Sequence, residues 1–418
     1  MDSARRPIRK LLALLAAALA GAALAVLLWA RSRVHERWAE MERRVAELAE
    51  EARARPYRLP SPPGPLLPGN AWDDYAAAAR EIWKVFGDGR GRQALLDVLV
   101  DLPRGTPVSY EEFRALLATC PHAFDLLIRG ARREDGRYPR DWGRLEADDA
   151  GGRTLNWLAN AALVEARRLA RSGETSRALT LLWAMARMGL DLGHNGTTLA
   201  EMLGGSFVIR AYEVLWVLVD EGRLDRPGLA DVDRGLEVLD RNFFAHGPAL
   251  RNDVLSWGQM YLRGGFFPER ESLKDARPTW RQLYSADFMK AASFLRMEEL
   301  SRLMAAAESL PYAEARRVAD DAAAELAASR NPLDRALKDG LPLAVARLEW
   351  IARIRLLRAI VRYRLDGQVP VLDDPFGTTL RSSVDARVVR VWSLGKNGVD
   401  DGGRHNWRDG DLVLEGPR

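Results

Sequence analysis

The sequence predicts a mainly α-helical protein: an N-terminal transmembrane helix, an irregular body of αα-hairpins and a small C-terminal antiparallel β unit. Three observations support this fold class. A long apolar run lies near the N-terminus, and apolar residues then recur at helical spacing through most of the chain. The last stretch changes to short β-type runs separated by glycine and aspartate. The chain has 418 residues, which is enough to bury a substantial core.

The apolar run extends from Leu11 to Trp29 without a charged side chain. As a helix it would be about 28 Å long, which matches a hydrocarbon core of about 30 Å. A cleaved signal peptide is the alternative, because Ala20, Gly21 and Ala22 offer small residues for cleavage. The run nevertheless exceeds the usual apolar region of such peptides, roughly 7–15 residues. We therefore predict an uncleaved, single-pass anchor.

Flanking charges give the orientation. The tail before the run is more basic than the segment after it, since it carries Arg5, Arg6, Arg9 and Lys10. The positive-inside rule then places the N-terminus in the cytoplasm. Arginine strongly outnumbers lysine, which is typical of a GC-rich bacterial genome, so the sequence predicts the bacterial inner membrane with a periplasmic body. The 62 basic and 58 acidic residues are interleaved, so we expect no nucleic-acid partner.

The segments follow from these patterns and from shifts in composition. We predict a cytoplasmic tail at 1–10, the anchor at 11–30, a juxtamembrane helix at 31–54, a Pro-rich linker at 55–70, the helical body at 71–344 and a final unit at 345–418. The linker has five prolines after Pro56, and proline excludes helix and central strand.

An apolar seam runs along the juxtamembrane helix between residues 34 and 48. Its members, spaced by four, three, four and three residues, are Val34, Trp38, Met41, Val45 and Leu48. Two readings fit this seam: a homodimer through a short coiled coil, or a stalk that packs on its own body. Two heptads do not decide between them.

The clearest unit of the body is residues 154–192, where two apolar stripes flank a turn that contains Gly173. This pattern predicts an αα-hairpin. Its sequence, EARRLARSGETSRALTLL, resembles one tetratricopeptide-type hairpin, and a looser echo at 215–239 has Gly222 in its turn. A repeat array normally needs about three units, and no third copy follows. Binding of a protein partner is an inference by analogy with such hairpins.

The residues do not favour an enzyme. The five histidines form no metal or nucleophile motif, and the chain has no phosphate-binding glycine loop. Cys120 is the single cysteine, which rules out an intrachain disulfide. A hydrolase with an unrecognised site in the helical body remains an alternative.

The tail holds a candidate calcium site. Glycines at 395, 398, 402, 403 and 410 let the backbone turn tightly among carboxylates, and calcium takes six to eight oxygen ligands. A plain turn is the other reading, since Asn-Gly and aspartate are common in turns. The candidate ligands are Leu394, Asn397, Asp400, Asp401, Asp409 and Asp411.

The same tail, DPFGTTLR…VWSLGKNGVDDGG…DGDLVLEGP, resembles the C-terminal region of the major pseudopilins of type II secretion systems. The likeness covers about residues 345–418, including the long helix that ends RYRLDG, and similar tails end uncharacterised membrane-anchored bacterial proteins. The resemblance implies a helix packed on a small sheet and a structural calcium ion. The apolar run lacks the pseudopilin processing site and its glutamate, so we do not expect a pilus subunit.

These observations lead to one function and two alternatives. The first is a non-enzymatic, membrane-anchored periplasmic protein with a helical protein-interaction body and a structural calcium loop; its protein partner is unknown. The second is an accessory component of a type II secretion or type IV pilus-like system. The third is the hydrolase named above.

Overall fold

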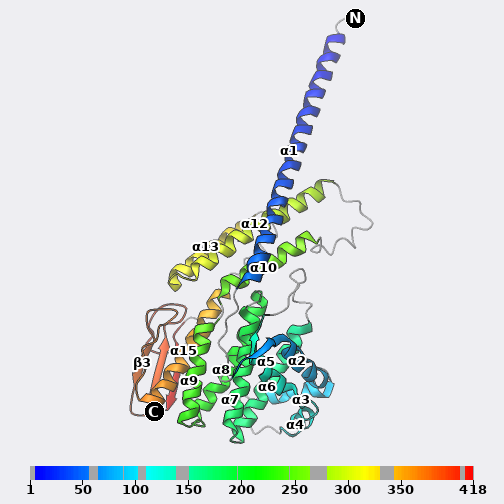
Figure 1. Cartoon of the computed structure of the whole chain (residues 1–418). Coiled ribbons are helices and arrows are strands. Elements are labelled where there is room, and N and C mark those ends of the chain that lie inside the picture. Colours follow the sequence, from blue (N-terminus) through cyan, green and yellow to red (C-terminus); the bar gives the residue numbers. More distant parts are fainter. Residues whose placement is uncertain are drawn as a thin grey trace.

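The structure is a computed structural model, and its helices account for most of the residues that it describes (Figure 1). The described residues are 5–55, 65–87, 89–101, 110–137, 150–194, 196–243, 245–263, 280–329, 343–404 and 410–417. Within them, the side chains of 5–20, 23, 27, 100, 101, 150, 151, 280–287, 343–346 and 417 are not described.

The helices follow the predicted order. They are α1 (Arg5–Ala54), α2 (Ala71–Phe86), α3 (Gly89–Asp101), α4 (Glu111–Leu117), α5 (Ala123–Ala131), α6 (Ala150–Arg171), α7 (Thr175–His194), α8 (Thr198–Asp220), α9 (Arg226–Asn242), α10 (His246–Leu262), α12 (Trp280–Ala307), α13 (Tyr312–Ala328) and α15 (Leu343–Asp366). The strands are β1 (Leu67–Asn70), β2 (Arg133–Asp135), β3 (Arg381–Val384), β4 (Val388–Ser393) and β5 (Leu412–Pro417).

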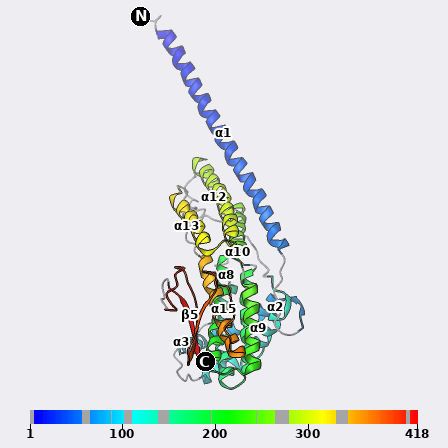
Figure 2. The same cartoon turned by 90° about the vertical axis from the view of Figure 1, so that its left-hand side faces the viewer.

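Helix α1 runs without a break through the apolar run and the juxtamembrane segment. Its 50 residues correspond to about 75 Å at 1.5 Å per residue. The upper half projects away from the body, as Figures 1 and 2 show, and Leu24, Val26, Leu28 and Trp29 are 58–63% exposed. The predicted outward continuation of the apolar helix is therefore present. Its insertion in a membrane stays a prediction.

The lower half of α1 packs on the body of its own chain. Met41, Val45 and Leu48 are buried in a cluster with Phe294 of α12 and Leu255 of α10. Arg251 of α10 adds an ion pair with Glu51. The seam therefore belongs to a stalk that packs on its own body, which is the second reading given above. A homodimer through residues 34–48 would have to displace these intramolecular contacts.

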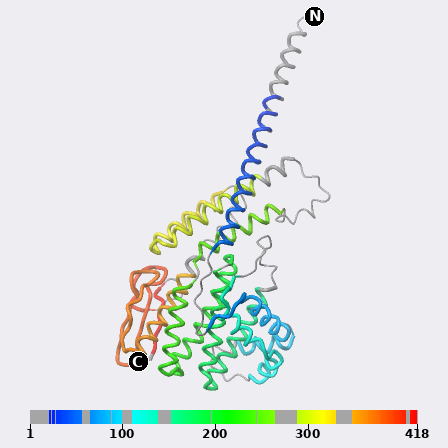
Figure 3. The backbone as a smooth tube through the Cα atoms, viewed as in Figure 1, coloured from blue at the N-terminus to red at the C-terminus, as the bar shows by residue number. Residues whose placement is uncertain are grey.

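The body is built from antiparallel helix pairs in two layers. Helices α6 and α7 form the predicted hairpin, whereas α8 packs mainly on α7, and α9 packs mainly on α15 (Figure 3). The turns contain Gly173 (φ 83°) and Gly222 (φ 64°), values that a residue without a Cβ adopts readily. One layer contains α2, α6, α8 and α15, and the other contains α5, α7 and α9.

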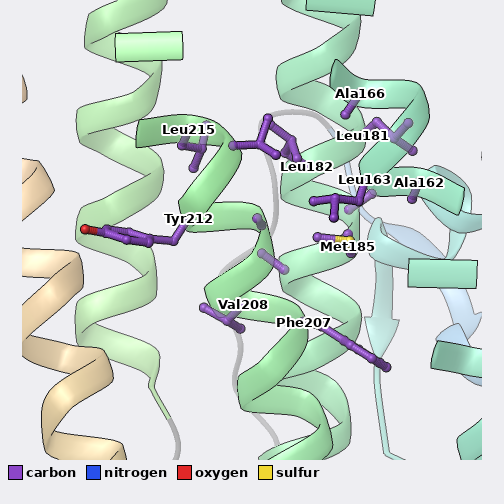
Figure 4. Packing of buried hydrophobic residues seen from close by; sticks show 14 of the residues in the cluster. Ala162, Leu163, Ala166, Leu181, Leu182, Met185, Phe207, Val208, Tyr212 and Leu215 are labelled. Carbon is purple, nitrogen blue, oxygen red and sulfur yellow. The ribbon is translucent and has the colours of Figure 1, made fainter. Parts of the chain in front are cut away.

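The centre of the core lies where α7 and α8 cross. Figure 4 shows side chains of α6, α7 and α8, among them Leu163, Met185 and Phe207, in this region. A side chain on Gly204 would place its Cβ 2.3 Å from the Gly189 carbonyl oxygen, and one on Gly205 would meet the Trp350 ring at 2.1 Å. These two glycines let α8 approach α7 and α15 closely.

Helix α8 is also long and apolar enough to cross a membrane, with a mean hydropathy of 1.5 over its most apolar window. More than half of that window, 56%, is buried within the protein. Helices α6, α7, α10 and α15 all contact it. We therefore interpret α8 as a core helix. The side chains of residues 5–20 lie outside the described part, so they do not enter this comparison.

The C-terminal unit is held to the body by charge and by apolar packing. The arginines of α15 face the acids of α9: Arg355 bonds Asp240 at 2.8 Å, and Arg362 bonds Asp233 at 2.6 Å. Strands β3, β4 and β5 form an antiparallel sheet in that order. Buried side chains of β4 join the core, as does α15. The predicted small antiparallel unit is present.

Two sequence predictions about strands were wrong. The sequence has a β-type run at residues 369–372, but this run forms no strand; next to it, Asp373 pairs with Thr379 in an isolated bridge across the Asp-Pro-Phe-Gly turn. The linker and body were expected to lack strands, yet β1 pairs in parallel with β2. These strands have four and three residues, too few to show alternation in the sequence.

Candidate functional site

Asp374 connects two separate parts of the tail motif. It is buried, and its Oδ1 accepts hydrogen bonds from the Phe376 amide at 3.0 Å and the Ser393 hydroxyl at 2.6 Å. Its Oδ2 accepts from the Leu394 amide at 2.8 Å. Protein donors therefore engage both oxygens, and Asp374 fastens the Asp-Pro-Phe-Gly turn to the end of β4.

The candidate calcium loop starts at Leu394 and turns at glycines in the left-handed region. Asp400 accepts from the Gly402 amide at 2.9 Å and from the Trp392 indole at 3.0 Å. Asn397 accepts from the Val399 amide at 2.9 Å and donates to Asp401 at 3.2 Å. These local bonds are those of aspartate and asparagine turns, so they fit a plain turn as well as a metal loop.

Asp411 is the most buried of the candidate ligands that the structure describes. It is fully buried at the start of the last strand, and its Oδ2 accepts from the Gly403 amide at 2.8 Å. Its Oδ1 is buried without a hydrogen-bond partner among the described residues. Burial raises the pKa of this carboxyl, and the neighbouring Asp400 and Asp401 carboxylates raise it further. The amides of Gly403 and Asp401 lower the pKa without reversing the shift.

A cation bound at Asp411 would neutralise its buried charge. Asp400, Asp401 and Asp411 stay predicted ligands. Asp409 lies outside the described residues. In the described part, no three His, Cys, Asp or Glu side chains already lie close enough to hold a metal ion. The main-chain carbonyl of Leu394 and the side chain of Asn397 stay predicted ligands.

We predict that Asp411→Asn changes stability in opposite directions with and without calcium. Because the pKa of Asp411 is raised, the folded state binds more protons than the unfolded state, and stability falls as pH rises above the ordinary aspartate value of about 3.9. At neutral pH the variant should therefore be at least as stable as the parent in chelator. Millimolar calcium should stabilise the parent by up to about 2.7 kcal/mol at a hundredfold excess over Kd, and not the variant.

Thermal unfolding of the full chain in detergent, with calcium, magnesium or chelator, measures this difference. Asp385→Asn is a matched control, since Asp385 makes turn hydrogen bonds in the β3–β4 connection. The highest calcium concentration is 5–10 mM, roughly ten times the weakest affinity of extracellular sites. If calcium at this concentration does not change the unfolding of the parent protein, the loop is a plain turn.

A groove of about 420 Å³ lies between α5, α7 and α9. Its apolar lining includes Leu179, Trp183, Leu190 and Val238. Its polar lining consists of Ser176, Thr180 and Asp231 together with the arginines Arg132, Arg187 and Arg234. An apolar cavity with a few polar groups is the usual form of a binding site.

A buried hydrogen-bond network supports the groove from beneath. The Arg187 Nε donates to Asp191 Oδ1 at 2.7 Å, and the Tyr75 hydroxyl of α2 donates to Asp191 Oδ2 at 2.9 Å. Asp191 is fully buried, and Arg187 is 5% exposed. The network ties α7 to α2 and fixes the position of one groove arginine.

Sequence reasoning missed this groove. Its residues come from three helices that the fold brings together, and no local motif marks them. Arg187 and Asp191, four residues apart on a helix that is otherwise largely apolar, are the one signal in the sequence: charges at core positions usually form a buried pair.

Comparisons with protein-family models, with curated proteins and with solved structures give no match for this chain. The pseudopilin-like tail and the tetratricopeptide-like hairpin therefore stay predictions. The function must be argued from the geometry alone.

Proposed function

We propose that this chain is a membrane-anchored protein of the bacterial periplasm whose helical body binds a protein partner in the groove between α5, α7 and α9. The groove is the observation that carries this proposal. It lies on the helical hairpins that the sequence associates with protein binding, and it combines an apolar lining with fixed polar groups. A non-enzymatic binding protein fits these features.

The anchor supports the same function. Helix α1 is continuous from the apolar run to residue 54, and its lower half is fixed to α10 and α12 by the buried cluster around Met41. A membrane span at residues 11–29 would hold the body at a set distance from the bilayer. The exposed Leu24, Val26, Leu28 and Trp29 would then contact lipid.

The calcium loop is proposed as a structural element. It lies beside the last strand, and a bound ion would offset the charge of Asp411 and hold β5 to the loop. This role concerns the stability of the C-terminal unit and its packing on α15, which α9 holds in place. It requires no chemistry at the metal.

The geometry ranks the two alternatives lower. A hydrolase would be favoured by converging carboxylates, but Asp231 is the one carboxylate in the described lining of the groove, and it pairs with Arg234. A role in a secretion or pilus-like machine rests on the tail resemblance, which no contact of the body supports.

Extraction of membranes with sodium carbonate tests the anchored part of this proposal. The full chain should remain in the membrane pellet, because a spanning helix resists release at high pH whereas a peripheral protein does not. Recovery of the full chain in the supernatant would contradict the proposal.

A further inference from the structure

We propose that the groove takes an extended segment of the partner that carries an acidic side chain next to an aliphatic or aromatic one. This inference rests on the proposed function, because it assigns a chemistry to the partner of the same groove. Shape, apolar lining and charge lead to it independently.

The shape of the groove favours an extended chain. The α7 residues that line it recur every three or four positions from Ser176 to Leu190. These 14 steps along the helix correspond to about 21 Å. At roughly 3.3–3.6 Å per residue, an extended segment of about six residues has the same length. A compact small molecule would leave part of this length unfilled.

The apolar lining offers fixed contacts for side chains. Trp183 packs so closely on α9 that a Cβ on Gly235 would lie 2.2 Å from its ring. The ring is therefore held against backbone while it remains half-buried at the groove. A large aromatic side chain in a fixed position is a common anchor for a partner's aliphatic or aromatic residue.

The three arginines of the groove lining differ in whether a carboxylate neutralises their charge. Arg187 is paired with Asp191, and Arg234 is paired with Asp231. Arg132 donates to the carbonyl oxygen of Pro65 at 3.2 Å, and its buried Nε has no hydrogen-bond partner in the described part of the chain. Arg132 thus lines the groove with a guanidinium that has no carboxylate partner among the residues that the structure describes.

The arginines near Arg132 in the sequence both have a carboxylate partner. Arg129 and Arg133, on either side of it, both bond the buried Asp74, which lies away from the groove lining. The pKa of Asp74 is lowered by these bonds although burial alone would raise it. Asp74 is therefore occupied, and a carboxylate for Arg132 has to come from elsewhere. A partner carboxylate would complete a charge-assisted pair with Arg132.

The position of Arg132 places that carboxylate at one end of the groove. The Tyr75 hydroxyl bonds Asp191. A Cβ on Gly130 would lie 2.6 Å from the Tyr75 ring. The end of α5, and with it Arg132, therefore lies near the part of α7 that carries Arg187 and Asp191. The partner's acid would bind at this end, and its apolar side chain would bind toward Trp183.

Fluorescence anisotropy with synthetic peptides tests the proposal on the full chain in detergent micelles. The probes are a labelled hexapeptide with the sequence Ser-Glu-Leu-Glu-Phe-Ser, the same peptide with Gln in place of Glu, and the same with Lys. The acidic peptide should bind at least about tenfold more tightly than the Gln peptide, the scale of one charged hydrogen bond. The Lys peptide should bind most weakly.

Three variants separate the causes. Arg132→Gln should remove the preference for the acidic peptide, while Arg177→Gln should retain it, because Arg177 is exposed on α7 and does not line the groove. Thr180→Trp should block every peptide, since Thr180 is an exposed groove residue whose replacement fills the space. Circular dichroism of each variant checks that the fold is retained.

The outcomes distinguish the two proposals. If the Glu and Gln peptides bind equally and Thr180→Trp blocks both, the groove is a binding site and the acidic preference is wrong. If Thr180→Trp leaves binding unchanged, or if no peptide binds at millimolar concentration, both the groove and the preference are overturned. Competition by free glutarate at the same concentration as peptide would show that a small carboxylate suffices and would overturn the extended segment.

Discussion

Replacing Leu15 and Leu19 together by arginine is expected to move the protein from the membrane pellet to the soluble fraction. Leu19 lies next to the centre of the predicted span, and Leu15 lies one turn away from it. One arginine at the centre of a membrane helix costs about 2.5–3.5 kcal/mol on insertion scales, so two cost at most about 5–7 kcal/mol. A run of this length, rich in alanine, has little surplus apolarity to offset that cost.

The measurement is carbonate extraction followed by blotting of both fractions. His35→Arg is the control for an added arginine, because it introduces one such charge at an exposed site on α1 beyond the span. The control should remain in the pellet. A Leu15/Leu19 double variant that stays with the membranes as firmly as the parent would mean that residues 11–29 are not the anchor.

Asp191→Ala is expected to lower the free energy of unfolding by about 3–5 kcal/mol. Its removal leaves the Arg187 guanidinium buried without its carboxylate, and it deprives the Tyr75 hydroxyl of an acceptor. Breaking one side of a buried ion pair typically has this cost, because the remaining charge is uncompensated. Since Arg187 also lines the groove, binding of peptide should weaken as well.

Urea unfolding of the full chain in detergent, followed by tryptophan fluorescence, measures the change. Asp231→Ala is the control, because its pair with Arg234 is exposed and worth at most about 1 kcal/mol. Tyr75→Phe should lie between the two, with a loss of about 0.5–1.5 kcal/mol for one hydrogen bond. Equal stability of the Asp191 and Asp231 variants would show that the buried network does not support the fold.

The helices were predictable because their signals are local. Apolar spacing located the α6–α7 hairpin to within a few residues of its observed ends, and the long helix that ends RYRLDG is α15. Glycines located the turns after α6 and α8, since Gly173 and Gly222 both adopt positive φ. The β unit was predictable for a similar reason: Asp374 and Asn397 lie in turns that their own side chains stabilise.

Features that depend on distant parts of the chain could not be read from the sequence. The seam from Val34 to Leu48 has the same pattern whether it meets a second copy or α10 and α12. The parallel pairing of β1 with β2 joins segments that are separated by four helices, α2 to α5. The groove is the clearest case, since Arg132 becomes notable only when its neighbours are seen bonded to Asp74.

The candidate calcium site was predictable from the sequence only in part. The aspartates and glycines that surround it were named from the sequence, and so was the plain turn as the other reading. The burial of Asp411 and its unfilled Oδ1 depend on how the loop folds back on β5. The burial of this carboxyl is therefore a feature that composition alone does not supply.

The most direct measurement of partner binding is site-specific photo-crosslinking in intact membranes. A benzophenone amino acid is placed at Ser176, which lines the groove, or at Arg177, the next residue, which does not. Both sites are exposed, so they differ mainly in the face of α7 that they report. We predict a defined protein adduct at residue 176, absent at residue 177 and weakened by Arg132→Gln. Equal adducts at both positions, or none at residue 176, would contradict binding in the groove.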